Sequence, residues 1–268
     1  MENDGYIRVD ENGKMESCIK GQIEQKYLPV IEDIVEKICE IGGSNIRSIL
    51  LRGSVACNKV IPGVSDIDFV IILKSTSEKM TQEIEMLAAK EAKKYQQVFT
   101  TIDLSCYEYA ECIRPENNRL LMNLKLTGRK VYGEDMICRL PDLYCNEEQA
   151  KRIYDQTVQE SWETLDRIKK RERICYMGIE RKPSFLCVWF MRSFCRGLIA
   201  FSMLETKRFS LNVGNSCEEF LACYPEYEKQ IRECQKLERE PSEDWEYLES
   251  ICEEVLLQYC SLGRKNGW

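Results

Sequence analysis

Two aspartates that follow a Gly-Ser pair across a short loop are the feature that most constrains this chain. Gly53 and Ser54 come directly after an apolar run, and Asp66-Ile67-Asp68 leads directly into a second apolar run. Short apolar runs bounded by turn residues predict buried strands. Successive side chains of a strand point to opposite faces, so we expect both carboxylates on one face and Ile67 in the core.

These residue types suit a site for a metal ion and a phosphate. Two carboxylates on one face repel each other, and a hard divalent cation such as Mg²⁺ is bound by oxygen ligands together with substrate phosphates. Gly53 permits close approach of the backbone to a ligand, and Ser54 offers a hydroxyl and backbone N–H groups to a phosphate. A Ser-Asp-x-Asp run is also common in solvated turns, so the order of strand, Gly-Ser, loop, Asp-x-Asp and strand is what favours the site.

The same order of residues resembles the signature of the nucleotidyltransferase superfamily, whose members are polymerase-beta-like. That signature is an apolar residue, Gly-Gly or Gly-Ser, a loop of this length, and Asp-x-Asp or Asp-x-Glu flanked by apolar residues. Gly53, Ser54, Asp66 and Asp68 match it, and Ser65 is a common companion. The resemblance implies that the two aspartates hold Mg²⁺ on a nucleoside triphosphate, and that the Gly-Ser pair and Ser65 bind the nucleotide.

A third acid, Asp103, lies in another apolar stretch, residues 98–106, between Ile102 and Leu104. A charged side chain is costly to bury without a partner, so Asp103 belongs at a strand edge, in a salt bridge or in a functional site. The superfamily carries a third carboxylate on the strand beside its Asp-x-Asp strand. The resemblance therefore implies that Asp103 completes the metal shell or accepts the proton of the acceptor hydroxyl. Arg52 departs from the signature, which usually has an aromatic or aliphatic residue there.

Hydrophobic periodicity and turn residues divide the first half into alternating elements. Residues 1–15 are polar and predict a loose segment. The expected helices are 16–41 and 78–95, the expected strands are 46–52, 67–74 and 98–106, and residues 115–133 predict a helix followed by an edge strand. Pro141 and the stretch 146–148, Asn-Glu-Glu, indicate a boundary. Together with the resemblance, this predicts an α+β chain with a nucleotidyltransferase domain at 1–145, built on a small mixed sheet with flanking helices.

The second half, residues 146–268, predicts an all-α helical bundle, and the resemblance implies that this domain binds the acceptor. Its expected helices are 148–177, 185–204, 216–236 and 241–261. Arg192 and Arg196 are four residues apart and share one helix face. They either pair with Glu residues of a neighbouring helix or reach the triphosphate. Arg129 and Lys130, in the first half, are likewise either solvated or in contact with phosphate.

The absence of histidine excludes whole classes of mechanism. The chain contains no His, so Ser-His-Asp triads, Cys-His dyads and His general bases are excluded. Acid–base chemistry must use Asp, Glu, Lys, Tyr or Cys. The net charge of −7 argues against general affinity for nucleic acid. It is compatible with a nucleotide whose charge a metal neutralises, and with a cationic second substrate.

Fifteen cysteines without one Cys-x-x-Cys pair predict small buried side chains in a reducing compartment. A zinc site is not expected without His or paired Cys. The N-terminus lacks the pattern of a signal peptide, and the longest apolar run, residues 185–204, is interrupted by Arg192 and Arg196. We therefore expect a cytoplasmic protein without a membrane partner.

The layout of a catalytic α/β domain before a helical domain resembles the aminoglycoside adenylyltransferases of the streptomycin/spectinomycin type. The helix with Arg196 and the helix end at Leu221, Tyr224 and Pro225 are similar. The resemblance implies transfer of AMP from ATP to a hydroxyl of a small acceptor, with aminoglycosides as first candidates, and with Arg196 on the nucleotide.

One difference concerns a lysine that this family uses to contact the nucleotide, shortly after the long helix. Residues 210–214 lack it, and Lys207 or Arg208 are the candidates to replace it. Two alternatives remain: a nucleotidyltransferase that modifies a protein, as antitoxins paired with helical toxins do, and an inactive relative that only binds nucleotide. The expected partners are a nucleoside triphosphate and a small acceptor, without nucleic acid, for a monomer or small homo-oligomer.

Overall fold

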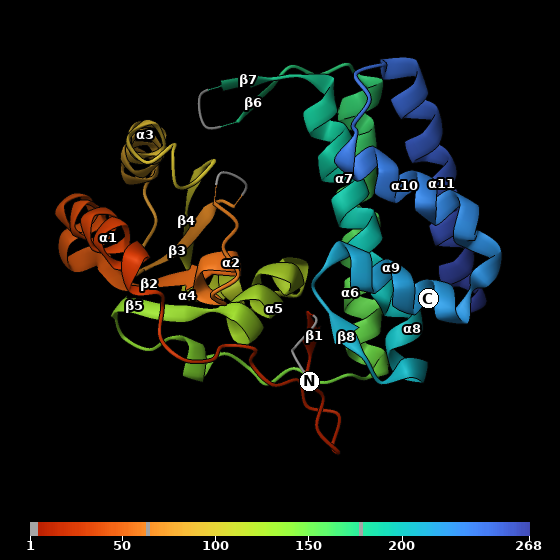
Figure 1. The fold of residues 1–268 in the computed structure, drawn as a ribbon, viewed down its shortest axis with the longest axis horizontal. Coiled ribbons are helices and arrows are strands. Elements are labelled where there is room, and N and C mark those ends of the chain that lie inside the picture. The colour runs from red at the N-terminus through yellow and green to blue at the C-terminus, as the bar shows by residue number, and fades with distance from the viewer. Residues whose placement is uncertain (1–4, 63–64, 177–178) are drawn as a thin grey trace. The chain divides into compact units, whose positions relative to one another are not determined.

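Two compact units make up the chain in the computed structural model, which describes residues 5–62, 65–176 and 179–268 (Figure 1). One unit, here called the sheet unit, is Ser17–Asp142. The other, here called the helical unit, combines the residues up to Glu16 with Leu143–Trp268. The division after Asp142 lies close to the boundary predicted at 145.

The N-terminal residues belong to the helical unit, whereas the sequence pattern assigned them as a loose part of a domain at 1–145. The strand β1 (Tyr6–Ile7) pairs antiparallel with β8 (Phe209–Ser210). In addition, the Tyr6 hydroxyl donates to Glu219 Oε1 at 2.7 Å. These bonds join residues that are far apart in the sequence, so a local polar pattern could not reveal them.

A four-stranded mixed sheet forms the centre of the sheet unit. Its order is β4 (Ile102–Glu108), β3 (Ile67–Leu73), β2 (Ile46–Arg52) and β5 (Arg129–Gly133). β3 is parallel to β4 and antiparallel to β2, which is antiparallel to β5. Every residue of β3 is buried, so both faces of the sheet are covered. The predicted α+β class with a small mixed sheet is confirmed.

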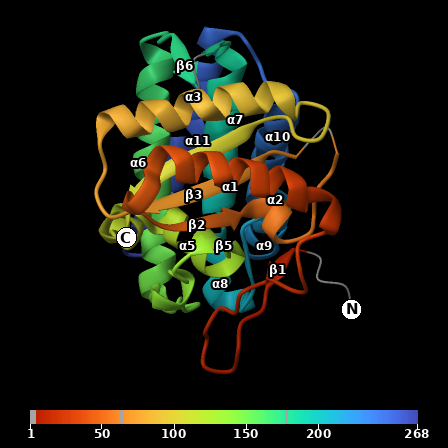
Figure 2. The same cartoon turned by 90° about the vertical axis from the view of Figure 1, so that its left-hand side faces the viewer.

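Helices α1 (Leu28–Gly42) and α3 (Glu78–Lys94) lie side by side over one face of this sheet (Figure 2). Their apolar side chains recur at helical spacing and are buried: Val30, Ile31, Ile34 and Ile38 in α1, and Met80, Ile84, Leu87 and Ala88 in α3. The remaining helical segments of the unit are η1 (Gln25–Tyr27), η2 (Gly43–Asn45), α2 (Gly53–Ala56), α4 (Tyr109–Cys112), η3 (Pro115–Asn117), α5 (Asn118–Thr127) and η4 (Ile137–Arg139).

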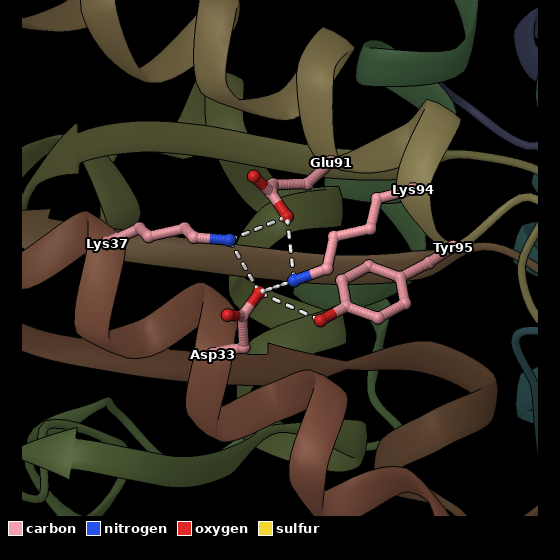
Figure 3. A network of polar contacts seen from close by, with 5 residues as sticks. All are labelled: Asp33, Lys37, Glu91, Lys94 and Tyr95. Carbon is pink, nitrogen blue, oxygen red and sulfur yellow. Dashed lines mark hydrogen bonds and ion pairs between the residues drawn. The ribbon is translucent and has the colours of Figure 1, made fainter.

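A charged cluster joins α1 to α3 (Figure 3). Asp33 Oδ2 accepts hydrogen bonds from Lys37 Nζ at 2.7 Å, Lys94 Nζ at 2.9 Å and the Tyr95 hydroxyl at 2.8 Å. Glu91, whose side chain is 1% exposed, lies 2.8 Å from Lys37 Nζ. Burial raises the pKa of Asp33, but the bonds from Lys37, Lys94 and Tyr95 outweigh it and hold this pKa well below its usual range.

Six α-helices form most of the helical unit: α6 (Glu147–Lys169), α7 (Pro183–Gly197), α8 (Ile199–Thr206), α9 (Val213–Cys223), α10 (Glu228–Arg239) and α11 (Trp245–Lys265). A 3-10 turn, η5 (Pro225–Tyr227), precedes α10. Besides β1 and β8, this unit contains a second two-stranded pairing, of β6 (Ile174–Tyr176) with β7 (Ile179–Arg181).

Two glycines allow the helices of this unit to approach closely. A Cβ at Gly197 of α7 would collide with Thr157 of α6, and one at Gly263 of α11 would collide with the Tyr154 ring. The Tyr259 hydroxyl donates to the Gly197 carbonyl at 2.9 Å. Around this contact the aromatic rings form one core cluster, which includes Phe194, Phe201, Phe220, Tyr224 and Trp268.

The apolar stretch Pro183–Thr206 has the length and composition of a membrane span, and 67% of its most apolar window is buried inside the protein. Burial of this degree is what a core helix of a folded unit shows. The predicted single helix at 185–204 is in fact two helices, since α7 ends at Gly197 and α8 begins at Ile199.

Two predicted helices are shorter than their periodicity indicated. The helix expected over 16–41 begins only at Leu28, because the preceding backbone carbonyls are bonded to distant side chains. The helix expected over 148–177 ends at Lys169, after which Arg171 adopts a left-handed φ of 49°. The strands β6 and β7 follow; the last residue of the predicted helix lies outside the described residues.

Candidate active site

Strand register brings two of the three predicted acids together. β3 and β4 are parallel, and the Cα atoms of Asp68 and Asp103 are direct partners in the ladder. Partners in register point to the same face of a sheet. Asp68 is only 8% exposed, and Asp103 is partly buried. The structure therefore places two carboxylates beside each other at the start of neighbouring strands.

Arg52 provides the positive charge between these carboxylates. It is the Cα partner of Asp68 in the antiparallel strand β2. Its Nη2 lies 3.1 Å from Asp68 Oδ1 and 3.6 Å from Asp103 Oδ2. The other oxygen of Asp103, Oδ1, accepts a hydrogen bond from Ser105 Oγ at 2.8 Å. Asp103 is thus in a salt bridge and on an edge strand. Both are structural roles that the sequence allowed for this carboxylate besides a functional one.

Gly53 makes room for the side chain of Asp68. Its φ is +73°, a conformation that side chains of L-residues rarely adopt. A Cβ at this position would lie 2.8 Å from Asp68 Oδ2. The turn continues as α2, after which Lys59 N bonds to the Ser54 carbonyl at 2.8 Å. A glycine is therefore required both for the backbone conformation and for the close approach of the carboxylate.

Asp66 lies one residue before β3 and is exposed. Its backbone carbonyl accepts a hydrogen bond from Ser54 Oγ at 3.4 Å, which connects the Gly-Ser turn to the Asp-x-Asp segment. Within the described part of the chain, no ion pair engages its carboxylate. Of the three acids, Asp66 is the one open to solvent.

Ser65 uses its polar groups to shape the loop. Its Oγ accepts from Ile61 N at 2.9 Å and its N donates to the Ile61 carbonyl at 2.8 Å. Its carbonyl accepts from Thr100 N at 3.0 Å. The Ser65 hydroxyl, which was predicted to bind nucleotide, thus accepts a hydrogen bond from the backbone of Ile61 in this structure.

The other predicted nucleotide contacts, Arg196 and Lys207, lie in the helical unit, where both are exposed. Arg196 is in the last turn of α7, and Lys207 caps α8 with a left-handed φ of 55°. Arg192 pairs with Glu238 of α10 at 2.6 Å. Of the two alternatives predicted for Arg192, the structure thus shows the ion pair with a Glu residue of a neighbouring helix. Arg208 pairs with Glu219 at 2.9 Å.

Arg129 also takes a structural role. Its guanidinium donates to the backbone carbonyls of Ala56, Gly21 and Lys20, the first at 3.1 Å and the second at 2.8 Å. It therefore holds the end of the Gly-Ser turn against the segment that leads into the sheet unit. Lys130 is exposed on β5.

Sequence patterns missed Arg52 as a partner of the acids and Ser105 as a donor to Asp103. The available signal was a cation at the end of an apolar strand, directly before the Gly-Ser pair. An ionised group at such a position needs a counter-charge. The pattern of β4 offers a comparable signal, because Ser105 follows Asp103 on the same strand face.

The residues fit a divalent cation by donor type. Asp66, Asp68 and Asp103 offer only carboxylate oxygens, which hard cations prefer, and Gly53 has no side chain to crowd Asp68 Oδ2. Among the described residues, no group of three acidic, His or Cys side chains has converged into a metal-binding cluster. Two of the acids are instead held by Arg52 while Asp66 points to solvent.

Comparison with known protein families identifies this arrangement. Residues 31–126 match the family model of the nucleotidyltransferase domain, and this range contains the Gly-Ser turn and all three acids. The sheet unit therefore contains a nucleotidyltransferase domain. The matched range begins in α1 and ends in α5, so it covers the central strands of the sheet unit.

Solved structures extend the similarity at the level of the fold. A spectinomycin adenyltransferase, AAD(9) from Enterococcus faecialis, crystallised with ATP and spectinomycin, matches with a TM-score of 0.55 and 12% identity over 85% of this chain and 97% of that chain. A toxin-antitoxin structure with AMP-PNP matches with a TM-score of only 0.31 and 18% identity over 52% of this chain and 98% of that one. Among curated proteins, no sequence matches significantly.

Proposed function

We propose that this nucleotidyltransferase transfers AMP from ATP to a hydroxyl group of a small acceptor, in a reaction that depends on Mg²⁺. The observation that carries the proposal is the register pairing of Asp68 with Asp103 beside the left-handed Gly53 turn. It places two carboxylates and an open backbone turn at one edge of the sheet. Asp66 adds a third, solvent-accessible carboxylate two residues before Asp68.

Asp66 and Asp68 would hold the divalent cation. When bound, such a cation neutralises the charge of a triphosphate and stabilises the leaving pyrophosphate. Gly53 has no Cβ that would crowd Asp68 Oδ2, and Ser54 fixes the turn to the backbone of Asp66. These residues fix the positions of the metal-binding carboxylates before the nucleotide binds.

Asp103 is the proposed acceptor of the hydroxyl proton. The chain has no histidine to serve as a general base, so a carboxylate is the available group. The Ser105 hydroxyl and the Arg52 guanidinium each hold one of its oxygens. This fixes the orientation of the carboxylate, which a general base requires.

A small hydroxyl-bearing compound is supported by the fold similarity to an adenyltransferase crystallised with spectinomycin. Aminoglycosides and spectinomycin are therefore the first acceptors to test. Their positive charge also suits a chain with a net charge of −7.

The test is pyrophosphate release from ATP and Mg²⁺ with a panel of aminoglycosides, with mass spectrometry of each acceptor. We expect one acceptor to gain an AMP group. Asp66→Asn and Asp68→Asn should each lower the rate by about a thousandfold, as loss of a metal-held transition state does. Glu116→Gln, which removes an exposed charge of the same unit, is the matched control and should keep full activity.

Two outcomes would contradict the proposal. Calorimetry that detects ATP binding, without pyrophosphate release for any acceptor, would favour a protein that only binds nucleotide. Full activity in both aspartate variants would contradict the assignment of the metal ligands.

A further inference from the structure

Two cysteine thiols touch each other directly behind the Gly-Ser turn. The Sγ atoms of Cys18 and Cys57 lie 3.4 Å apart. Cys57 is the residue that ends α2, and its N–H bonds to the Gly53 carbonyl at 3.1 Å. Cys18 lies in the segment that leads into the sheet unit, where its N–H bonds to the Leu126 carbonyl at 2.9 Å. Neither thiol belongs to the transfer site described above.

The backbone holds the two thiols together without help from the sulfur atoms. Asn58, which follows Cys57, donates through Nδ2 to the Gln22 carbonyl at 2.8 Å and accepts from Glu24 N at 3.3 Å. Arg129 adds hydrogen bonds to carbonyls on both segments. A disulfide has an S–S length of about 2.05 Å. The sulfur atoms therefore need to approach by little more than one ångström to form a bond.

The surroundings make one thiol of the pair nucleophilic. A hydrogen bond from Cys57 lowers the pKa of Cys18 to about 7, against the effect of burial and with help from the charge of Lys59. The same hydrogen bond and burial raise the pKa of Cys57. These directions favour Cys18 as the thiolate and Cys57 as the proton donor, and both side chains are partly exposed. Thiolate character and access are the two conditions for oxidation by peroxide.

A second thiol pair shows what these conditions add. Cys195 and Cys217 also share a hydrogen bond, but both side chains are completely buried in the helical unit. That hydrogen bond and burial raise the pKa of Cys195 well above its ordinary value. This pair has contact without access, so it serves as an internal comparison.

We propose that Cys18 and Cys57 form a hydroperoxide-reactive site that is converted to an intramolecular disulfide. The Cys18 thiolate attacks a peroxide oxygen, the O–O bond breaks, and Cys18 becomes a sulfenic acid. The sulfur of Cys57 then attacks Cys18, the S–O bond breaks, and hydroxide leaves with the Cys57 proton as water. In sum, two thiols and one hydrogen peroxide give one disulfide and two waters.

The product would cross-link the chain just behind the phosphate-binding turn. It joins residues 39 positions apart and ties the end of α2 to the entering segment. A disulfide stabilises mainly by restricting the unfolded chain. The oxidised protein should therefore be more stable than the reduced one, whatever the acceptor of the transfer reaction is.

The experiment treats the full-length, reduced protein with hydrogen peroxide in small excess, blocks the remaining thiols in denaturant, and maps the peptides by mass spectrometry. We expect a Cys18–Cys57 cross-link with the loss of two hydrogens as the main product. Its rate should rise with pH to a plateau through about pH 7. In Cys57→Ser, dimedone should trap a sulfenic acid at Cys18. In Cys18→Ser, labelling at Cys57 should fall roughly tenfold or more, since an ordinary thiol is mostly protonated at pH 7.

Three results would overturn the proposal. The first is oxidation of the exposed Cys138 and Cys175 before any Cys18–Cys57 cross-link forms. The second is a cross-link of Cys195 with Cys217 at a similar rate in the folded protein. The third is equal sulfenic acid formation in the two serine variants. None of these readouts uses nucleotidyl transfer, so they are independent of the proposed activity.

Discussion

Two polar clusters of the sheet unit use the same kinds of side chain with a different balance of charge. Between α1 and α3, the carboxylates Asp33 and Glu91 face two lysines (Figure 3). At the start of β3 and β4, Arg52 forms ion pairs with Asp68 and Asp103, and a third carboxylate, Asp66, lies two residues before Asp68. The two carboxylates and two lysines of the first cluster sum to a formal charge of zero. The three carboxylates and Arg52 of the second sum to a formal charge of −2.

This difference distinguishes a structural cluster from a site prepared for a ligand. A balanced cluster gains its full stabilisation on folding, because each charge has its partner. An unbalanced one keeps repulsion that a divalent cation relieves when it binds. The formal charge of −2 on Asp66, Asp68, Asp103 and Arg52 together is equal in magnitude and opposite in sign to that of one Mg²⁺ ion. Substitutions in the two clusters should therefore differ in their effects on activity, on stability and on the response to Mg²⁺.

The largest effect is expected from Asp103→Asn. The amide keeps the size of the side chain and can still accept from Ser105, but it cannot take a proton. The kcat for transfer should fall by about a hundred- to ten-thousandfold, with KM for ATP little changed. Steady-state kinetics with the identified acceptor checks this. A kcat within about tenfold of wild type would remove Asp103 from the role of general base.

Arg52→Met should lower the stability of the protein and make that stability more dependent on Mg²⁺. Loss of the half-buried pairs should lower the free energy of unfolding by about 2 kcal/mol, between the values for exposed and buried ion pairs. Added Mg²⁺ should then raise the melting temperature more in the variant than in wild type, since the cation replaces the missing guanidinium. Differential scanning fluorimetry with and without Mg²⁺ measures both quantities.

Lys37→Met is the matched control, because it removes a cation from the balanced cluster. It should also lose stability, but its response to Mg²⁺ should equal that of wild type. The comparison between the clusters fails if Mg²⁺ stabilises both variants to the same extent.

The smallest effect concerns acid stability. The pKa of Asp33 is lowered in the folded state, so its contribution is complete above the unfolded pKa of about 4 and is lost as the pH falls from there through the folded pKa. At pH 7, Asp33→Asn should lower the free energy of unfolding by about 2 kcal/mol, as expected for hydrogen bonds to a charged group. Urea titrations should show this gap shrinking below about pH 4. A gap that is constant with pH would contradict the assignment.

Local patterns were sufficient for the central strands and for the acids that they carry. The apolar runs predicted β2 and β3 to within one residue, and the alternation in the third stretch placed Asp103 on a strand. Local patterns do not encode register. That Asp68 faces Asp103, and that Arg52 reaches both, follows from the parallel and antiparallel pairing of three strands, which depends on the whole sheet.

Helix boundaries were predicted less well where side chains from distant parts of the sequence form hydrogen bonds with backbone carbonyls. The periodicity of residues 16–41 is genuine, but Arg129 binds the carbonyl of Gly21 and Asn58 binds that of Gln22, so these groups cannot serve a helix. Gly21 itself has a φ of +60°. Tertiary hydrogen bonds outweigh helix propensity here, because propensity amounts to less than about 1 kcal/mol per residue.

The pairing of Tyr6–Ile7 with Phe209–Ser210 also bears on the order in which the protein is completed during synthesis. All strands of the mixed sheet have been made once Asp142 has left the ribosome. β1, the first strand of the helical unit, can by contrast pair with β8 only after about 200 residues that follow β1 have been synthesised. This takes roughly 10–40 s at ~5–20 residues per second. During that time this strand lacks its pairing partner. A substitution that breaks the pairing would therefore disturb the unit that is completed later rather than the sheet unit.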